Sequence, residues 1–519
     1  MKRPFALIGI TYLSVQAALF YLESDLAAAI LTAVCFIGTI VSLFILKNRN
    51  LRHTVLGFCL TAAFASTIFS GYNIFVKQPI VDKYSEREIY VTATVLEKPT
   101  VQYDTYRYLI ETDSINGKIE KLKICLSTIN ELNVEEFDRI SCVLPLKECT
   151  KSQMIADGAF LQASVNKNFA YIVKKTDDKP LYYQAVKIRE NFADSFEQNM
   201  SQDCASLCRA VLLGEKTALS QEIQNDFTRC GVSFLIVVSG MHLAIISSFV
   251  FLCIKKIIKN RVLRSMIMLM CAFSFMAVTG FAPSVVRAGV MLAVVYSGKM
   301  FMRKGDSLNS LGIAALILTV PNPTAVADVG MLLSFTATLG IILWARKISV
   351  YIMGKFAKLK RLKKPVEFTV NLFAVSVSAA VWTMPISVLM FGKVSVFSIL
   401  LSVILSPAVS VLVACAYGFG IVSIIAYPLT FVCEQLSKYV IFIVGTFSDI
   451  PFSSVNARKP YFYIWLALIA VMVIVGYFVK NKANYAVKSA VISLCVLALG
   501  FAVYSEIDLN TTVININAT

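Results

Sequence analysis

Long apolar segments recur along almost the whole of this chain, and they constrain its fold more than any other feature. Most of them approach the roughly 20 residues that an α-helix needs to cross a bilayer. Only 16% of the 519 residues are charged and the mean hydropathy is +0.70, whereas about 25% of the residues of a soluble domain are charged. The sequence therefore predicts an α-helical polytopic membrane protein with about 13 spans. The predicted spans are 5–22, 26–46, 54–72, 232–254, 265–281, 284–302, 308–320, 328–345, 367–390, 396–426, 428–447, 461–479 and 486–504.

The positive charge of the chain is concentrated between these apolar runs. The formal net charge is +17, but 24 of the 49 Lys and Arg residues lie in six short stretches without Asp or Glu. Basic loops of this kind face the cytoplasm by the positive-inside rule, so the charge indicates topology and not binding of DNA. We expect the N-terminus inside and the C-terminus outside. The six stretches are 2–3, 47–52, 255–264, 299–304, 346–364 and 480–488.

The segment 76–180 differs from the rest, because it is polar and carries short stretches with period-two patterning. About five strands with an Asn-Gly hairpin signal at 116–117 favour a small all-β barrel of the OB type. The segment follows the third span, so we expect this OB-like domain on the extracytoplasmic side. One disulfide is permitted there among Cys125, Cys142 and Cys149, with the pair left open.

Tyr103, Tyr106 and Tyr108 of this domain admit two interpretations. With Arg107 they form a candidate stacking platform for single-stranded DNA, since aromatic and basic side chains bind single strands in this way. The alternative, which we favour, is a Tyr-rich strand that packs on its own sheet. Residues 85–175 carry 12 basic and 13 acidic residues, so no positive groove is visible.

Changes in composition divide the chain into five parts. Residues 1–75 form the N-terminal three-span region, and 76–180 form the OB-like domain. Residues 181–230 are an amphipathic connector, predicted as helices at the outer surface of the membrane, although a plain connecting helix fits equally well. Residues 231–506 form the multi-span core, and 507–519 form a short extracytoplasmic tail.

Three small or polar residues interrupt the apolar run at 228–250. Ser239, Gly240 and His242 lie near its middle, where polar groups are costly and usually face a cavity, a partner or a pathway. The alternative is that Ser239 and Gly240 form a small-residue helix contact and that His242 hydrogen-bonds a neighbouring backbone carbonyl. The residues themselves leave both interpretations open.

Arg287 is the second unexpected polar residue of the core. It either extends to the interface or faces a water-filled path, where a guanidinium is well suited to phosphate. Asp328 is a candidate partner for it. No nucleophile–base arrangement, no phosphate-binding glycine loop and no Cys-x-x-Cys pair accompanies these residues. We therefore expect no catalysis, no cofactor and no metal.

Four segments, taken in order, resemble the ComEC competence-channel family. The run 209–246 contains Leu-Leu-Gly and then Val-Ser-Gly-Met-His at 238–242, which is similar to the Ile-Ser-Gly-Leu-His of the family. The segments 282–291, 330–341 and 381–410 resemble its Arg-Ala-x-x-Met, Phe-Gln-Leu-Ser-Phe and Pro…Phe-Gly…Pro motifs. The three first spans, the β-rich domain and the multi-span core also agree with the family plan.

The resemblance implies an inner-membrane channel that takes one strand of transforming DNA into the cytoplasm. It further implies single-stranded DNA, a cytoplasmic ATP-driven translocation protein, a DNA receptor and a separate nuclease as partners, and it is compatible with a homo-oligomer. Many members continue into a metallo-β-lactamase-like domain, which this sequence lacks, so we expect no nuclease activity from it. The pathway residues that the resemblance implies are Ser239, Gly240, His242, Arg287, Ser334, Pro385 and Pro407.

Two positions depart from the family pattern. Ser402 stands where the family usually has Asn, and Leu332 stands where it has Gln, so two amide groups are missing from the predicted path. Two other functions are therefore considered beside the channel. One is transport of another anionic solute, a lipid or wall precursor, which the near-neutral charge of the OB-like domain slightly favours. The other is a non-transporting remnant of a competence channel.

Overall fold

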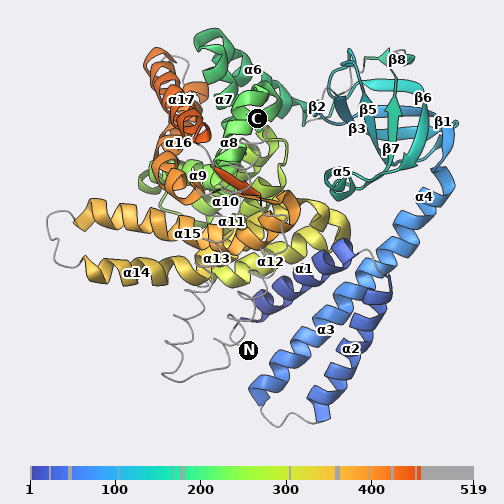
Figure 1. The fold of residues 1–519 in the computed structure, drawn as a ribbon, viewed down its shortest axis with the longest axis horizontal. Helices are drawn as coiled ribbons and strands as arrows, with labels where there is room; N and C mark the ends of the chain where they lie inside the picture. Colours follow the sequence, from blue (N-terminus) through green and yellow to red (C-terminus); the bar gives the residue numbers. More distant parts are fainter. Residues whose placement is uncertain are drawn as a thin grey trace, which may run out of the picture. The chain divides into compact units, whose positions relative to one another are not determined.

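The computed structural model describes the chain in twelve stretches and contains mostly helices, with one small β-barrel (Figure 1). Among the described residues, eight helices are long and apolar enough to cross a membrane, and two shorter apolar helices accompany them. A polytopic membrane protein is therefore consistent with the structure, whereas the predicted spans 461–479 and 486–504 lie outside the described residues. The described residues are 3–22, 25–44, 49–102, 105–166, 169–175, 179–180, 182–302, 305–356, 363–395, 397–421, 426–450 and 453–456.

The described residues group into two compact units. The first holds Met1–Ser220, Leu235–Phe335 and Val409–Ser437, and the second holds Gln221–Phe234, Thr336–Ala408 and the described residues from Lys438 onward. The first unit contains the N-terminal helices, the barrel and most of the predicted pathway residues.

The N-terminal region consists of three apolar helices, of which α1 packs against α3 and α2 packs against α3. Helix α1 also crosses α12 (Ser307–Thr319) at two glycines, Gly9 and Gly312, whose missing side chains let the two backbones touch. Helix α3 ends at Tyr72, where the sequence places the end of the third span, and a short π-helical turn then continues directly into α4. The helices are α1 (Pro4–Leu22), α2 (Asp25–Phe44), α3 (Arg49–Tyr72), the turn Asn73–Lys77 and α4 (Gln78–Tyr84).

The barrel occupies residues 87–174 and closes on itself. Its strands pair in the order β1-β3-β5-β7-β6, β6 pairs back to β1, and only the β5–β7 pair is parallel. The predicted β-rich domain is thus present, although it begins at Arg87 and not at 76. The strands are β1 (Arg87–Val95), β2 (Thr100–Gln102), β3 (Thr105–Ile115), β4 (Lys118–Ile119), β5 (Lys123–Thr128), β6 (Arg139–Glu148), β7 (Ala159–Val165) and β8 (Tyr171–Lys174).

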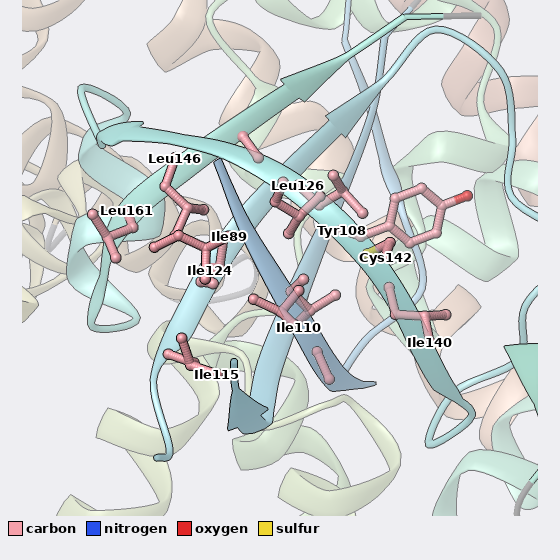
Figure 2. Packing of buried hydrophobic residues seen from close by; sticks show 14 of the residues in the cluster. Ile89, Tyr108, Ile110, Ile115, Ile124, Leu126, Ile140, Cys142, Leu146 and Leu161 are labelled. Carbon is pink, nitrogen blue, oxygen red and sulfur yellow. The ribbon is translucent and has the colours of Figure 1, made fainter. Parts of the chain in front are cut away.

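Alternate residues of these strands fill the barrel interior (Figure 2). Tyr108 is one of them: it is 1% exposed, and its hydroxyl accepts a hydrogen bond from the Leu132 backbone N–H at 2.8 Å. Tyr106 is partly buried against the same core. Tyr108 is therefore not available for a stacking platform, because its ring packs inside the core of the barrel. Tyr103 lies outside the described residues.

The three cysteines of the barrel lie in two different clusters. Cys125 on β5 and Cys149 after β6 share a small apolar cluster, and their thiols are hydrogen-bonded to each other. Cys142 belongs to the interior of the barrel. No disulfide is formed among the described cysteines. Of the three cysteines of the barrel, Cys125 and Cys149 are the two whose thiols lie beside each other.

The connector forms helices, as expected, but one of them is not a surface helix. Nine of the twelve residues of α7 are buried, because most of its side chains are small or apolar. A positive-φ Gly214 ends α7 in the left-handed conformation that favours glycine at helix C-termini. The connector consists of α6 (Tyr183–Asn199), α7 (Gln202–Leu213), the 3-10 turn Lys216–Ala218 and α8 (Gln221–Arg229).

Ion pairs join the barrel to the connector. Arg189 on α6 donates to the Glu136 carboxylate of the β5–β6 loop at 2.6 Å, and both side chains are nearly enclosed, at 12% and 3% exposed. Lys98 of the barrel lies 3.2 Å from Glu190, and Arg209 on α7 lies 2.7 Å from Glu215. Burial raises the pKa of Glu136, and the neighbouring Arg189 opposes that rise.

The elements that follow the connector begin with the 3-10 turn Ser233–Leu235 and continue to α13. They are α9 (Gly240–Ile257), α10 (Arg261–Val278), α11 (Pro283–Met300), α12, the 3-10 turn Pro323–Ala327 and α13 (Val329–Gly340). Asn260 caps α10 by accepting hydrogen bonds from the Val262 and Leu263 N–H groups.

From Ile341 onward, the described chain is helical apart from one short pair of strands. Helix α16 runs through Pro407 without a break, so the 396–426 run is not interrupted at that proline. Strands β9 and β10 pair antiparallel. The elements are the π-helical turn Ile341–Ala345, α14 (Arg346–Lys355), α15 (Lys363–Phe391), β9 (Lys393–Ser395), α16 (Ser398–Ile421), α17 (Ala426–Ser448) and β10 (Ser454–Asn456).

The enclosed Arg189–Glu136 pair generates a prediction about pH. Arg189→Met leaves Glu136 buried without its counter-ion, so we expect a loss of stability on the order of 3 kcal/mol at neutral pH. A carboxyl whose folded pKa is raised loses stability as pH rises, so this loss shrinks as the pH falls and Glu136 is protonated. Thermal unfolding of the purified protein at several pH values measures it.

Two further variants make this test specific. Adding Glu136→Gln to Arg189→Met is expected to recover most of the stability, because no buried charge is then left. Lys175→Met, which removes a lysine that is 76% exposed in its ion pair with Glu135, serves as the matched control and should change little. A pH-independent effect of Arg189→Met would contradict the buried-charge explanation.

Candidate functional site

Helix α9 begins with a reciprocal cap inside the apolar segment that the sequence singled out. Ser239 is extended, and its side chain accepts from the His242 backbone N–H, while the His242 ring accepts from the Ser239 backbone N–H at 3.1 Å. His242 is 1% exposed. The imidazole therefore does bond the local backbone, as one interpretation held, but as an acceptor from an N–H group and not as a donor to a carbonyl.

This hydrogen bond fixes the tautomer of the ring. A backbone N–H can only donate, so Nδ1 of His242 must carry a lone pair. In a neutral imidazole the proton then lies on Nε2, which becomes a donor. Nε2 is buried and has no hydrogen-bond partner among the described residues. One donor in the first turn of α9 is thus unsatisfied among the described residues.

Gly240 lets α9 and α11 approach closely. A Cβ atom at this position would lie 2.9 Å from the Ala288 Cβ, closer than two carbon atoms can pack. The Ser284 hydroxyl, in the first turn of α11, donates a hydrogen bond to the Val238 carbonyl at 2.7 Å. This bond connects α11 to the segment just before α9. The small-residue contact expected for Ser239 and Gly240 is present at Gly240.

Arg287 lies one turn into α11, beside this crossing. Its Nη2 atom is 3.6 Å from the place where a Gly240 Cβ would be, so the guanidinium is located at the start of α9. The side chain is only 6% exposed and does not extend to the interface. Its guanidinium carbon lies 5.5 Å from the centre of the Phe335 ring, a cation–π contact that holds the group.

The charge of Arg287 is not neutralised by the acid that the sequence offered. Asp328 instead caps α13, where its carboxylate accepts from the Gly330 N–H at 2.9 Å and the Met331 N–H at 3.1 Å. Nε and Nη1 of Arg287 are buried and have no hydrogen-bond partner among the described residues. A buried cation without a partner is costly, so this arrangement needs an explanation other than stability.

The groups at this site share one property: they donate hydrogen bonds. The first N–H groups of a helix lack partners within the helix, and the helix dipole makes this end positive. Arg287 and the Nε2–H of His242 add a charge and a further donor. Chemically, such a site attracts an anion and repels a cation. No group of three metal-ligating side chains occurs among the described residues.

The other predicted pathway residues fall into two groups. Ser334 precedes Phe335 on α13 and is half-buried, so it belongs to the first unit with Ser239, Gly240, His242 and Arg287. Pro385 in α15 and Pro407 in α16 are half-buried residues of the second unit. The His242 and Arg287 segments thus lie together in the first unit, whereas the two prolines belong to the second unit.

Three residues of the site were not among the predicted pathway residues. Phe335 and Ala288 are ordinary apolar residues, and only their contacts with Arg287 and Gly240 reveal their roles. Ser284 is one turn before Arg287, which is a sequence signal for the same helix face.

Ser402 is one of the two positions that depart from the family pattern. Its hydroxyl donates a hydrogen bond to the Ser398 carbonyl at 2.5 Å, within its own helix.

Fold and site together define a polytopic membrane protein with a polar site inside its helical core. A family model described as "Competence protein" matches residues 211–482, which is more than half of the chain, so the chain belongs to this competence protein family. The family is of the channel type and is not a known catalytic one. The resemblance found in the sequence is thereby confirmed.

A curated relative shows the same relationship. The chain is similar to ComE operon protein 3 of Bacillus subtilis (strain 168), with 24% identity over 161 residues. That match covers 31% of this chain and 21% of the length of the relative, so the two are compared over only a part of each. No solved structure matches the chain.

The close crossing at Gly240 generates the second prediction. Gly240→Ala places a methyl group 2.9 Å from the Ala288 Cβ, so α9 and α11 must separate, at a cost of about 1–3 kcal/mol. The midpoint of thermal unfolding in detergent measures the loss. Gly354→Ala, whose new methyl group meets no atom within 4 Å, is the matched control.

A compensating change tests the mechanism. Adding Ala288→Gly to Gly240→Ala removes the facing methyl group and should recover most of the lost stability. If the double variant is as unstable as Gly240→Ala, the contact between these two positions does not set the approach of the helices.

Proposed function

We propose that this protein is an inner-membrane channel for the uptake of single-stranded transforming DNA into the cytoplasm. Membership of the competence protein family supports a role in DNA uptake. The observation that carries the proposal at the level of residues is Arg287, a buried cation at the start of α9 that no described acid neutralises. Polar groups at membrane depth are retained where they serve a pathway, and the cargo of this pathway is a polyanion.

The barrel is proposed to be OB-like. Its closed strand order, its single parallel strand pair and its five main strands support this assignment. In OB folds the loops between the first and second and between the fourth and fifth strands often contact the ligand. Here the loop between β6 and β7 carries α5 (Ser152–Ala156), and the Ala156 carbonyl accepts from the Asn322 side chain at 2.7 Å.

That docking, together with the buried Tyr108, favours a structural role for the barrel over DNA stacking. The barrel segment also has no excess of basic residues, with 12 basic and 13 acidic residues over 85–175. We propose that the barrel is a scaffold outside the membrane. DNA capture then depends on a separate receptor protein.

The energy for uptake is proposed to come from a cytoplasmic ATP-driven partner. The sequence contains no Gly-x-x-x-x-Gly-Lys-Ser/Thr motif that would hold nucleotide phosphates. Degradation of the second strand is assigned to a separate nuclease, and assembly as a homo-oligomer is compatible with the channel. The proposed topology has the N-terminus in the cytoplasm and the barrel and the C-terminus outside.

One alternative function has an observation in its favour. The near-neutral barrel and the anion-attracting site would also suit a transporter for another anionic solute, such as a lipid or wall precursor. The difference lies in the cargo, so the decisive measurement is the transport of DNA itself. A non-transporting remnant predicts no transport of either cargo.

Uptake of labelled DNA tests the channel. A deletion strain should lose cytoplasmic uptake and transformants, and wild-type protein should restore both. His242→Ala and Arg287→Ala should fail to restore uptake when they are expressed at the wild-type level, because each removes a donor from the pathway. Arg261→Gln, which changes an exposed arginine at the start of α10, is the matched control and should restore uptake. Unchanged uptake in the deletion strain would exclude the channel function.

The orientation is tested by cysteine labelling in intact cells. Lys355→Cys, at the end of α14, is expected in the cytoplasm and should resist a membrane-impermeant maleimide. Ile119→Cys, at a barrel position that is 89% exposed, should be labelled from outside. The wild-type chain gives the background from native cysteines. Labelling of Lys355→Cys but not Ile119→Cys would reverse the topology.

A further inference from the structure

Arg287 and the first turn of α9 have the composition of a ligand site without a protein acceptor. The guanidinium is 94% buried, as follows from its exposed fraction of 6%, and two of its nitrogens have no hydrogen-bond partner among the described residues. We propose that these groups form a binding site for a single phosphodiester monoanion. The proposal deepens the proposed function, and it rests on that function only in naming the DNA backbone as the source of the diester.

Charge selects the class of ligand. One guanidinium supplies one positive charge and the positive end of one helix about half a charge, which together fully offset the single negative charge of a phosphodiester. A guanidinium also binds two oxygens of one phosphate at once, which a lysine ammonium does not. The Nε2–H of His242 supplies a further neutral donor from the same helix turn.

The geometry brings the guanidinium and the start of α9 close together. Gly240 has no side chain, and a Cβ there would lie 3.6 Å from Nη2 of Arg287, in the space beside the guanidinium. Phe335 covers the guanidinium through a cation–π contact and leaves the N–H groups at its edge for hydrogen bonds. The Ser284–Val238 hydrogen bond fixes α11 against the start of α9.

Such a site recognises the backbone of a nucleic acid and not its bases. All of the groups assigned to it are donors, whereas the edges of bases present both donors and acceptors. Contacts to phosphate carry no sequence information, so passage past Arg287 would be independent of sequence. The donors are enclosed in this structure, so a phosphate reaches them only when the surrounding helices separate transiently.

The unliganded site should be a cost to stability. A buried charge without a partner is unfavourable, and replacing it by an apolar side chain of similar size is often neutral or stabilising. A purely structural arginine would behave in the opposite way, because its removal would lower the melting temperature. The stability of Arg287→Met without ligand therefore separates a binding role from a structural one.

Thermal unfolding of the purified full chain tests the proposal. The protein is held in an uncharged detergent without phosphate, and the ligands are oligothymidylate, a neutral methylphosphonate oligothymidylate and a short-chain phosphatidylglycerol, at constant ionic strength. Oligothymidylate should raise the melting temperature of wild type and of the matched control Arg261→Gln, and the neutral analogue should not.

The variants give the quantitative expectation. Arg287→Met should melt at or above the wild-type temperature without ligand and should bind oligothymidylate about thirtyfold more weakly or worse. Arg287→Lys keeps the charge but loses the two-oxygen contact, so it should bind with intermediate affinity. His242→Gln should weaken binding less than Arg287→Met does, because it removes a neutral donor.

The outcomes separate the sources and the two proposals. Stabilisation by phosphatidylglycerol alone would support a phosphodiester site and assign it to lipid headgroups. Absence of any shift with either diester, or equal shifts in wild type and Arg287→Met, would overturn the site. DNA uptake in cells is measured independently of binding. Uptake without binding at Arg287 would therefore overturn the site alone, and binding without uptake would overturn the channel function alone.

Discussion

The contact between α9 and α11 at Gly240 and Ala288 is the constraint on which the site depends. Two small residues let the helices approach, and the approach brings the guanidinium of Arg287 to the positive end of α9. Two positive groups are therefore held together in a buried place, which folding alone would not favour. Packing of the surrounding helices must supply the free energy that maintains this arrangement.

The environment of the site explains how a buried cation is tolerated. Phe335 contributes a cation–π contact, and the reciprocal cap between Ser239 and His242 satisfies one N–H at the start of α9 while leaving Nε2 of the ring as a donor. Asp328 is held by the first turn of α13 and does not neutralise the arginine. Asp328 is thus engaged in a helix cap, and Nε and Nη1 of Arg287 have no hydrogen-bond partner among the described residues.

The barrel depends on a different kind of interaction. Its interior is closed by alternating apolar side chains, whereas its attachment to the connector is ionic, through Arg189 and Glu136 and through the Lys98 and Glu215 pairs around them. The α5 loop adds a hydrogen bond from Asn322 and apolar packing with Ala327.

The sequence by itself determined the membrane-spanning helices, the β-rich insertion and the segments around His242 and Arg287, because hydropathy, period-two patterning and misplaced polar residues are local signals. It left open whether the ring of Tyr108 packs on its own sheet and did not predict the burial of α7, since both depend on what packs against the segment. Only the tertiary structure showed that Arg287 lies at the start of α9, that Asp328 is engaged elsewhere and that Phe335 and Ala288 complete the site. Residues more than forty positions apart come together there through helix packing, and no local pattern in the chain encodes that contact.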